Sequence, residues 1–307
     1  MTVLDTNTMR VPPGLVVAPQ LPDLMVPVKI RRGFLGFLRN HPTVAIGGAL
    51  LILLVLVGIL APWLWTVDPT AIAPARRTRV PSADYWFGTD LLGRDIYSRV
   101  IYGARVSLTV GLSVAVLASL AGLAIGLVSG FVRWADGIIM RFMDGLMSIP
   151  PILLAVALMA LTRASVGNVI LAITIAEIPR VSRLVRSVVL SLREQPYVDA
   201  ATASGTRTPM IILRHILPNT LAPMLVQATY ICASAMIVES ILSFIGAGTP
   251  PTIPSWGNIM AEGRALWQIK PYIVFFPAAF LSVTVLAVNL LGDGLRDALD
   301  PRMAKSL

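Results

Sequence analysis

Long uncharged stretches dominate the pattern of hydrophobic and polar positions along the chain. A helix that crosses the hydrocarbon core of a membrane needs about 20 predominantly apolar residues. Five windows approach or exceed that length without one charged residue, namely 44–65, 106–132, 145–162, 219–238 and 271–292. This pattern predicts an all-α integral membrane protein.

Two expected spans differ from a plain apolar helix. The window 145–162 contains Pro150 and Pro151, so we expect a bend or an interruption there. A further span begins with the apolar stretch 164–176 and continues in helical pattern across Glu177 and several arginines. Its inner end is therefore cationic. With this span the total is six, which places both termini on the same side of the membrane.

The composition supports a membrane protein and indicates its orientation. Hydrophobic residues make up 56% of the chain and charged residues 13%, whereas a soluble domain has about 25% charged residues. The formal net charge of +9 could indicate nucleic-acid binding, but most of the 25 Lys and Arg lie in segments that are cytoplasmic if the N-terminus is inside. We therefore expect no nucleic acid, a multi-pass protein of the cell (inner or plasma) membrane, and cytoplasmic N- and C-termini.

The residue inventory argues against catalytic and cofactor chemistry. The single cysteine, Cys232, excludes a disulfide scaffold and a cysteine-built zinc site. The two histidines, His41 and His215, lie far apart, and no serine lies in a GxSxG motif. The nucleotide-binding pattern GxxxxGK[ST] does not occur either. We expect no catalytic, cofactor or metal site, and any ATP must be bound by another chain.

The predicted inner loop, 193–218, is too long for a simple connection, since helix connections usually take about 2 to 8 residues. Small residues in 197–204 allow a short helix, which Gly205 can end by adopting a positive φ. The apolar run 210–217 allows a second helix that ends at Pro218. Such a projection suits docking into a groove on a partner, whereas an amphipathic interfacial helix without a partner is the alternative.

Three features of this loop resemble the EAA loop of importer permeases of the ATP-binding cassette (ABC) superfamily. They are the run Asp199-Ala200-Ala201, Gly205 four residues later, and Leu217-Pro218. In that family the loop supplies the coupling helix, which sits in a cleft of the ATPase subunit. The resemblance implies that the ATPase-coupling residues are Tyr197, Asp199, Ala200, Ala201, Gly205, Arg207, Leu217 and Pro218.

The loop departs from the family pattern at two positions. Asp199 stands where Glu is usual, and His215 stands where the family has an apolar residue. Asp keeps the negative charge of Glu, so we expect coupling to be retained.

Other segments are similar to the second permease subunit of dipeptide, oligopeptide and nickel importers, namely 31–42, 87–108, 250–257 and 292–302. The resemblance implies a six-helix ABC type I importer permease with the MetI-like fold. It also implies a set of partners. These are a homologous second permease subunit, two ABC ATPase subunits that bind ATP and Mg, an extracytoplasmic substrate-binding protein, and membrane lipid.

The spans and the resemblance together predict the organisation of the chain. The parts are a flexible cytoplasmic tail with a basic pre-span segment (1–42), the first transmembrane helix (43–65), an extracytoplasmic loop (66–104), the core permease domain (105–292) with its coupling loop (193–218), and a cytoplasmic C-terminal tail (293–307).

The cargo cannot be read from these motifs. The resemblance favours peptides of the dipeptide and oligopeptide class, because they are the commonest cargo of the family. Nickel chelates and glutathione-like compounds are alternatives within the family. A hypothesis from another class is an ion-coupled secondary transporter that uses Glu177, but no inverted repeat is detectable in the sequence.

Charged residues in the predicted outer loop form a second candidate site. Asp95 and Arg99 are spaced i,i+4, which on a helix is a stabilising pair. Asp90 resembles a helix cap. We expect a structural cap that seals the outer gate or faces the binding protein, and we rank a site for a zwitterionic peptide below it. The residues assigned to this region are Asp90, Arg94, Asp95, Arg99 and Trp256.

Two glutamates within the predicted spans are candidates for the lining of the pathway, because ionisable residues at membrane depth are functional by default. Glu177 lies about 20 Å into its span, but Arg180 at i+3 can neutralise it. This spacing favours an ion pair near the inner interface over a substrate contact. Glu239 lies near the outer end of the fifth span, where it would line the outer vestibule or reach lipid headgroups.

A stripe of small residues runs along the second span. Its members recur every four residues and are Ala118, Gly122, Gly126 and Gly130. Small residues at this spacing let helices approach closely. Packing within the subunit, or against its sister, is therefore favoured over a translocation groove.

Overall fold

The computed structural model describes residues 34–299 of the chain. The chain divides into two compact units, 1–37 and 38–307. Of the first unit, only the start of helix α1 (Phe34–Asn40) is described. The two predicted tails fall largely in 1–33 and 300–307, outside the described residues.

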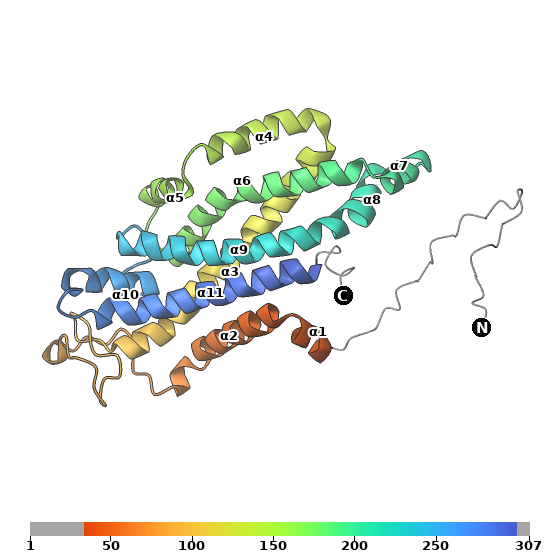
Figure 1. Ribbon diagram of the computed structural model, residues 1–307. Coiled ribbons are helices and arrows are strands. Elements are labelled where there is room, and N and C mark those ends of the chain that lie inside the picture. The colour runs from red at the N-terminus through yellow and green to blue at the C-terminus, as the bar shows by residue number, and fades with distance from the viewer. Residues whose placement is uncertain (1–33, 300–307) are drawn as a thin grey trace, which may run out of the picture. The chain divides into compact units, whose positions relative to one another are not determined.

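In the described part of the second unit, five long helices run beside one another (Figure 1). They are α2 (Pro42–Ile59), α3 (Ile96–Phe131), α6 (Val166–Arg193), α9 (Leu217–Phe244) and α11 (Tyr272–Leu299). Within residues 34–299, the extended pairing is limited to an isolated bridge between Thr89 and Asp95. The all-α prediction is therefore confirmed.

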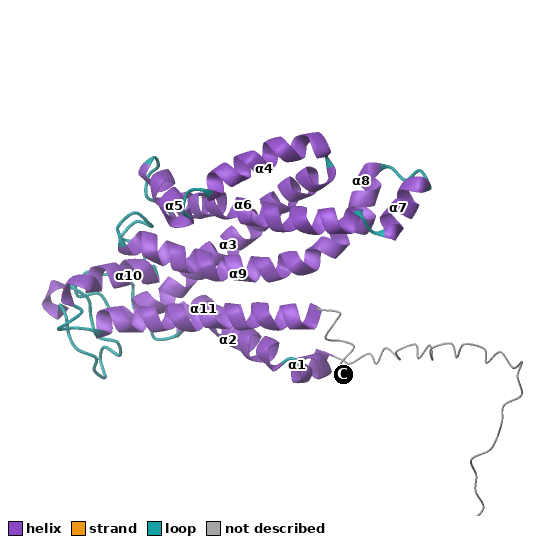
Figure 2. Ribbon diagram, turned by 45° about the horizontal axis from the view of Figure 1, so that its top comes forward, coloured by secondary structure: helices purple, strands orange, loops and turns teal. Residues whose placement is uncertain are grey.

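Shorter helical segments join the long helices. They are the 3₁₀ turns Ala61–Trp63 and Pro74–Arg76, α4 (Arg133–Met147), α5 (Pro151–Ala160), α7 (Pro196–Ala203), α8 (Thr208–Ile211), the π turn Ile212–Ile216, α10 (Trp256–Gly263) and the 3₁₀ turn Arg264–Leu266. Figure 2 shows α7 and α8 together at one end of the helices, here termed the α7–α8 end. Helix α10 and the long loop that follows α2 lie at the opposite end, here termed the α10 end.

Helix α3 packs along α6 through the stripe of glycines. A Cβ added to Gly122 would lie 2.4 Å from Cβ of Val181, and one added to Gly126 would lie 2.6 Å from Cβ of Val185. Gly130 meets the next valine of α6, one turn further on, in the same way. Both series repeat every four residues, so the valine ridge of α6 fits the glycine groove of α3. Of the two predicted alternatives, packing within the subunit or against its sister, the structure shows the first.

Among residues 34–299, four helices are long and apolar enough to cross a membrane, namely α2, α3, the continuous helical segment that ends with α9, and α11. A fifth candidate is the pair α4 and α5, which is bent by 86° at the break between the helices. The predicted interruption at Pro150 and Pro151 is thus confirmed. The window 145–162 is not one helix, however, because α5 has only 10 residues and rises about 15 Å.

Several predicted boundaries shift in the structure. The first transmembrane helix was expected over 43–65 but ends at Ile59, shortly before Pro62, since the residue preceding a proline disfavours helical geometry. The outer loop was expected over 66–104, but α3 already begins at Ile96. The predicted C-terminal tail was expected from 293, but α11 continues to Leu299.

Candidate functional site

The predicted coupling loop forms a helix, a glycine turn and a second helix. Helix α7 ends in Ala203, and Gly205 follows with φ +78°. The amide of Gly205 donates to the carbonyl of Thr202, and the amide of Thr206 donates to that of Ala201. This pair of bonds is the Schellman motif, which requires a left-handed residue after the helix. The predicted role of Gly205 in the turn is confirmed.

The second helix of the loop does not end at Pro218, contrary to the sequence-based expectation. The chain passes from α8 through the π turn directly into α9, and Pro218 lies in the first turn of α9, where proline is tolerated. The amide of Leu217 donates to the carbonyl of Ile212. The Nδ2 of Asn219 donates to the carbonyl of His215 at 2.6 Å. The wider turn and this side chain accommodate the proline without a break.

The loop has one anchored face and one exposed face. Val198, Ile211 and Ile216 are buried against the helices. On the other face Met210 is 50% exposed and Leu213 60% exposed. The exposed residues of the predicted set are Tyr197, Asp199, Ala200, Gly205, Arg207 and Pro218, while Ala201 and Leu217 are half-buried. A short helical projection with exposed apolar side chains is a surface suited to a protein partner.

At the α10 end, four charged side chains form an outer ionic cluster of Asp90, Arg94, Arg99 and Glu262. The Oδ2 of Asp90 lies 2.7 Å from Nε of Arg94 and 2.5 Å from Nη1 of Arg99. Glu262 of α10 accepts from Arg94 and from both terminal nitrogens of Arg99. Asp90, Arg94 and Arg99 are almost completely buried. Two positive and two negative groups therefore compensate each other and join the start of α3 to α10.

This arrangement corrects the expected roles of three residues. Asp95 does not pair with Arg99. It is the N-cap of α3 and accepts from the Ser98 amide at 2.8 Å. Asp90 is not a helix cap, because its carboxylate is taken up by the two arginines and by the turn amides of Leu92 and Arg94.

Trp256 lies inside the chain and not on its surface. It has no exposed area, and its Nε1 donates to the carbonyl of Val100 at 2.9 Å. A Cβ on Gly103 would lie 2.9 Å from the indole ring. Trp256 and the buried charges therefore hold α3 against α10, and in this conformation they do not face a binding protein. Only Asp95 of the predicted outer set is partly accessible.

Glu177 lies beside a cavity of about 300 Å³ between α5, α6, α9 and α11. Its Oε2 is 3.3 Å from Nη1 of Arg180, which confirms the predicted ion pair. Ser234 donates to its Oε1 at 3.4 Å, and the Arg180 guanidinium lies 5.7 Å from the ring centroid of Tyr230. Asn289 of α11 also lines this cavity, so four polar or charged side chains accompany Glu177 in an otherwise apolar wall.

Glu239 does not reach the headgroups or line an open vestibule in this conformation. It is completely buried, and Ser243 donates to its Oε1 at 2.8 Å. Ser243, Thr249 and Asn258 are linked in one buried polar network that joins α9 to α10. Sequence reasoning missed this network and also missed Glu262, because their partners lie on other elements and no short-range spacing marks them.

The geometry above coincides with two family matches. Residues 118–305 match the family of binding-protein-dependent transport system inner membrane components. The chain belongs to this family. Residues 32–81 match the N-terminal transmembrane domain of oligopeptide transport permease C. It is therefore a multi-pass inner-membrane permease of the oligopeptide permease C type, within an ABC transporter whose ATPase activity resides in partner subunits.

Several relatives of this permease are similar along most of their length. A probable peptide ABC transporter permease of Sinorhizobium fredii is 55% identical over 86% of this chain and 90% of the relative. The dipeptide transport system permease protein DppC of Alkalihalophilus pseudofirmus is 41% identical over 87% and 88%. The glutathione transport system permease protein GsiD of Escherichia coli is 42% identical, also over 87% and 88%.

Solved structures show the fold of the permease. Two crystal forms of the inward-facing MetNI methionine ABC transporter contain a chain that superimposes with TM-scores of 0.53 and 0.55. The identity is 18% and 19%, and the match covers 66% of the permease and 96% of the MetNI chain. The permease therefore has the MetI-like fold.

Proposed function

We propose that this permease is one of the two membrane subunits of a peptide importer and forms part of the pathway through which short peptides cross the membrane. The observation that carries the proposal is the 55% identity, over 86% of the chain, to a probable peptide ABC transporter permease. Energy comes from ATP hydrolysed by two separate ATPase subunits. The homologous second permease completes the pathway, and an extracytoplasmic substrate-binding protein delivers the peptide.

The proposed topology has six spans with both termini cytoplasmic. Besides the four apolar helices, the bent pair α4 and α5 contributes one span and α6 another. Helix α6 has 28 residues and rises about 42 Å. Three of its four arginines are paired with carboxylates, Arg180 with Glu177, Arg183 with Asp144 and Arg186 with Asp136. Paired charges are tolerated at membrane depth, and the many arginines towards the α7–α8 end favour a cytoplasmic location for it.

In this proposal the coupling loop transmits the motion of the ATPase subunit. Its exposed face, with Tyr197, Met210 and Leu213, docks in a cleft of the ATPase. Its buried residues Val198 and Ile211 bind the loop to the helices. Because α8 continues through the π turn into α9, a displacement of the loop tilts α9. Rigid-body rocking of the two permeases then alternates access to the pathway.

Glu177, Arg180 and their polar neighbours mark the face of the permease that lines the pathway. Polar groups at membrane depth face a water-filled route or another chain, since lipid cannot solvate them. The ion pair with Arg180 satisfies the charge of Glu177. This arrangement supports a lining role, and the family membership removes the need for an ion-coupled mechanism.

The proposal is tested by transport in proteoliposomes. The complete transporter is reconstituted with its binding protein, and the ATP-dependent uptake of radiolabelled dialanine is measured in the presence of unlabelled dipeptide, oxidised or reduced glutathione, or a nickel–histidine chelate. We expect uptake to require ATP and to be inhibited by unlabelled dipeptide. Stronger inhibition by a nickel chelate or by glutathione than by unlabelled dipeptide would reassign the cargo, and uptake that depends on a proton gradient without ATP would refute the importer.

A further inference from the structure

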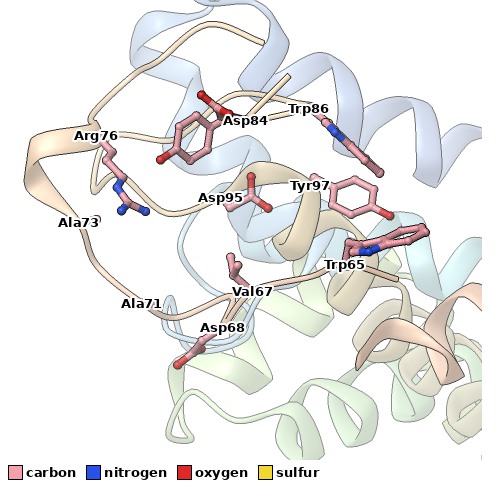
Figure 3. A pocket seen from close by; sticks show the side chains of 12 residues that line it. Trp65, Val67, Asp68, Ala71, Ala73, Arg76, Asp84, Trp86, Asp95 and Tyr97 are labelled. Carbon is pink, nitrogen blue, oxygen red and sulfur yellow. The ribbon is translucent and has the colours of Figure 1, made fainter. Parts of the chain in front are cut away.

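A second cavity, of about 550 Å³, lies at the α10 end, between the chain that follows α2 and the start of α3. Figure 3 shows Asp95 in the middle of this outer pocket, with Trp65, Trp86 and Tyr97 on one side and Arg76 on the opposite side. The volume lies within the range of about 300–1,000 Å³ that is typical of small-molecule sites. None of the roles proposed above uses this pocket.

The aromatic wall of the outer pocket is fixed within the chain. The rings of Trp86 and Tyr97 meet edge to face at 4.8 Å between centroids, and Trp65 lies 6.5 Å from Trp86. The hydroxyl of Tyr97 donates to the carbonyl of Leu64 at 3.0 Å. The rings are thus held in place before any ligand enters. A cation that lies against such rings is attracted by their electron-rich faces.

Negative charge dominates the polar lining of the pocket. It contains the carboxylates of Asp68, Asp84 and Asp95 and a single guanidinium, that of Arg76. The hydrogen bonds that Thr70 donates hold the pKa of Asp68 below its usual value. In Asp95, one oxygen accepts from the amide and hydroxyl of Ser98. Its other oxygen makes no hydrogen bond within the described residues and is available to a ligand.

The depth of the pocket argues against lipid as the ligand. The 18 residues of α2 rise about 27 Å, close to the hydrocarbon thickness of about 30 Å. The end of α2 lies level with Arg105, whose guanidinium donates to the carbonyls of Gly58 and Ile59. Asp95 precedes Arg105 by ten residues, so it lies about 15 Å beyond that level, on the side away from the membrane. The headgroup layer extends only about 5–8 Å beyond the hydrocarbon core. The outer pocket faces water.

We propose that the outer pocket binds the protonated amino group of a short peptide, with the ammonium between Asp95 and the aromatic wall. Arg76, on the opposite side, is placed for the peptide carboxylate. A ligand with both charges matches both sides of the pocket, which favours a free peptide over an isolated lysine side chain of a partner protein. This inference rests on the proposed peptide cargo, which it extends to a site outside the membrane pathway.

The test is equilibrium dialysis of radiolabelled dialanine against the purified transporter in lipid nanodiscs, without the binding protein. We expect the complex to retain dialanine and to bind N-acetyl-dialanine at least about tenfold more weakly, because acetylation removes the ammonium charge. Asp95→Asn should weaken dialanine binding at least about tenfold while α3 stays capped, since Asn caps helices about as well as Asp. Trp86→Leu should weaken it about threefold to tenfold.

Trp63→Leu is the matched control, because Trp63 is exposed at the same end but does not line the pocket. The affinity of this variant for dialanine should stay within about twofold of the wild-type affinity. Equal retention of both dipeptides, wild-type binding by both pocket variants, or no retention by the wild type would overturn the site. ATP-driven uptake of dialanine with no retention in dialysis refutes the pocket alone, whereas absence of uptake with retention in dialysis refutes the importer proposal alone.

Discussion

The two ends of the permease differ in how they treat charged and apolar side chains. At the α10 end, Asp90 and Arg99 are buried, Glu262 is half-buried, and the three charged groups compensate each other within the chain. At the α7–α8 end, the apolar side chains of Met210 and Leu213 are exposed. A chain that folds by itself avoids exposing clustered apolar side chains. The charges of the outer ionic cluster are therefore compensated within one subunit, while the apolar face of the coupling loop is covered only when a partner docks on it.

The largest effect is expected at Gly205. In Gly205→Val the residue must keep φ near +78°, which a β-branched side chain resists, so the turn between α7 and α8 is lost. ATP-dependent uptake should fall to background while the amount of permease in the membrane stays within about twofold. Gly137→Val is the control, because a Cβ there meets nothing within 4 Å and φ is not positive. Normal uptake by Gly205→Val at normal abundance would remove the coupling assignment.

A stability effect is expected from the outer ionic cluster. Arg99→Met leaves Arg94 alone to compensate both Asp90 and Glu262, and an uncompensated buried charge costs about 3–5 kcal/mol. The measurement is thermal unfolding of the purified complex. Arg183→Met is the matched control, since its pair with Asp144 is about half exposed and should contribute about 0–1 kcal/mol. Equal losses in both variants would contradict the distinction between a buried and an exposed pair.

A smaller loss is expected where α3 and α6 pack against each other. Gly126→Val places new atoms against Val185, and overpacking of this kind costs about 1–3 kcal/mol. Adding Val185→Ala should restore part of the loss, because it removes the opposing side chain. The double-mutant cycle in thermal unfolding measures this coupling. Independent, additive effects would show that the two helices do not meet here.

The smallest effect on folding is expected at the exposed face of the coupling loop. Met210→Ser should change stability by no more than about 0.5 kcal/mol, yet it should reduce the ATPase recovered with the permease several-fold. Met147→Ser, at an exposed position of α4, serves as the control and should leave recovery unchanged. Undiminished recovery with Met210→Ser would place the ATPase contact elsewhere.

The features that sequence predicted well depend on neighbours along the chain. The apolar windows, the turn at Gly205 and the pair of Glu177 with Arg180 all involve residues within a few positions of each other. Glu262 could not be found in this way, because its partner Arg99 is 163 positions away. Because Asp90 and Glu262 bind the Arg99 guanidinium, Arg99 does not form the predicted pair with Asp95. Pro218 failed as a stop signal because the π turn before it and the Asn219 side chain accommodate the proline, so the helical segment continues.

The separation of Arg99 from Glu262 also sets an order of assembly. A ribosome that has completed α3 has produced Asp90, Arg94 and Arg99, with two positive groups and one negative group among them. The second carboxylate arrives only when α10 emerges, after α6 and α9 have been made. The charges at the start of α3 are therefore not balanced until α10 has been synthesised. In a nascent permease that stops before residue 262, the cluster therefore carries one uncompensated positive charge.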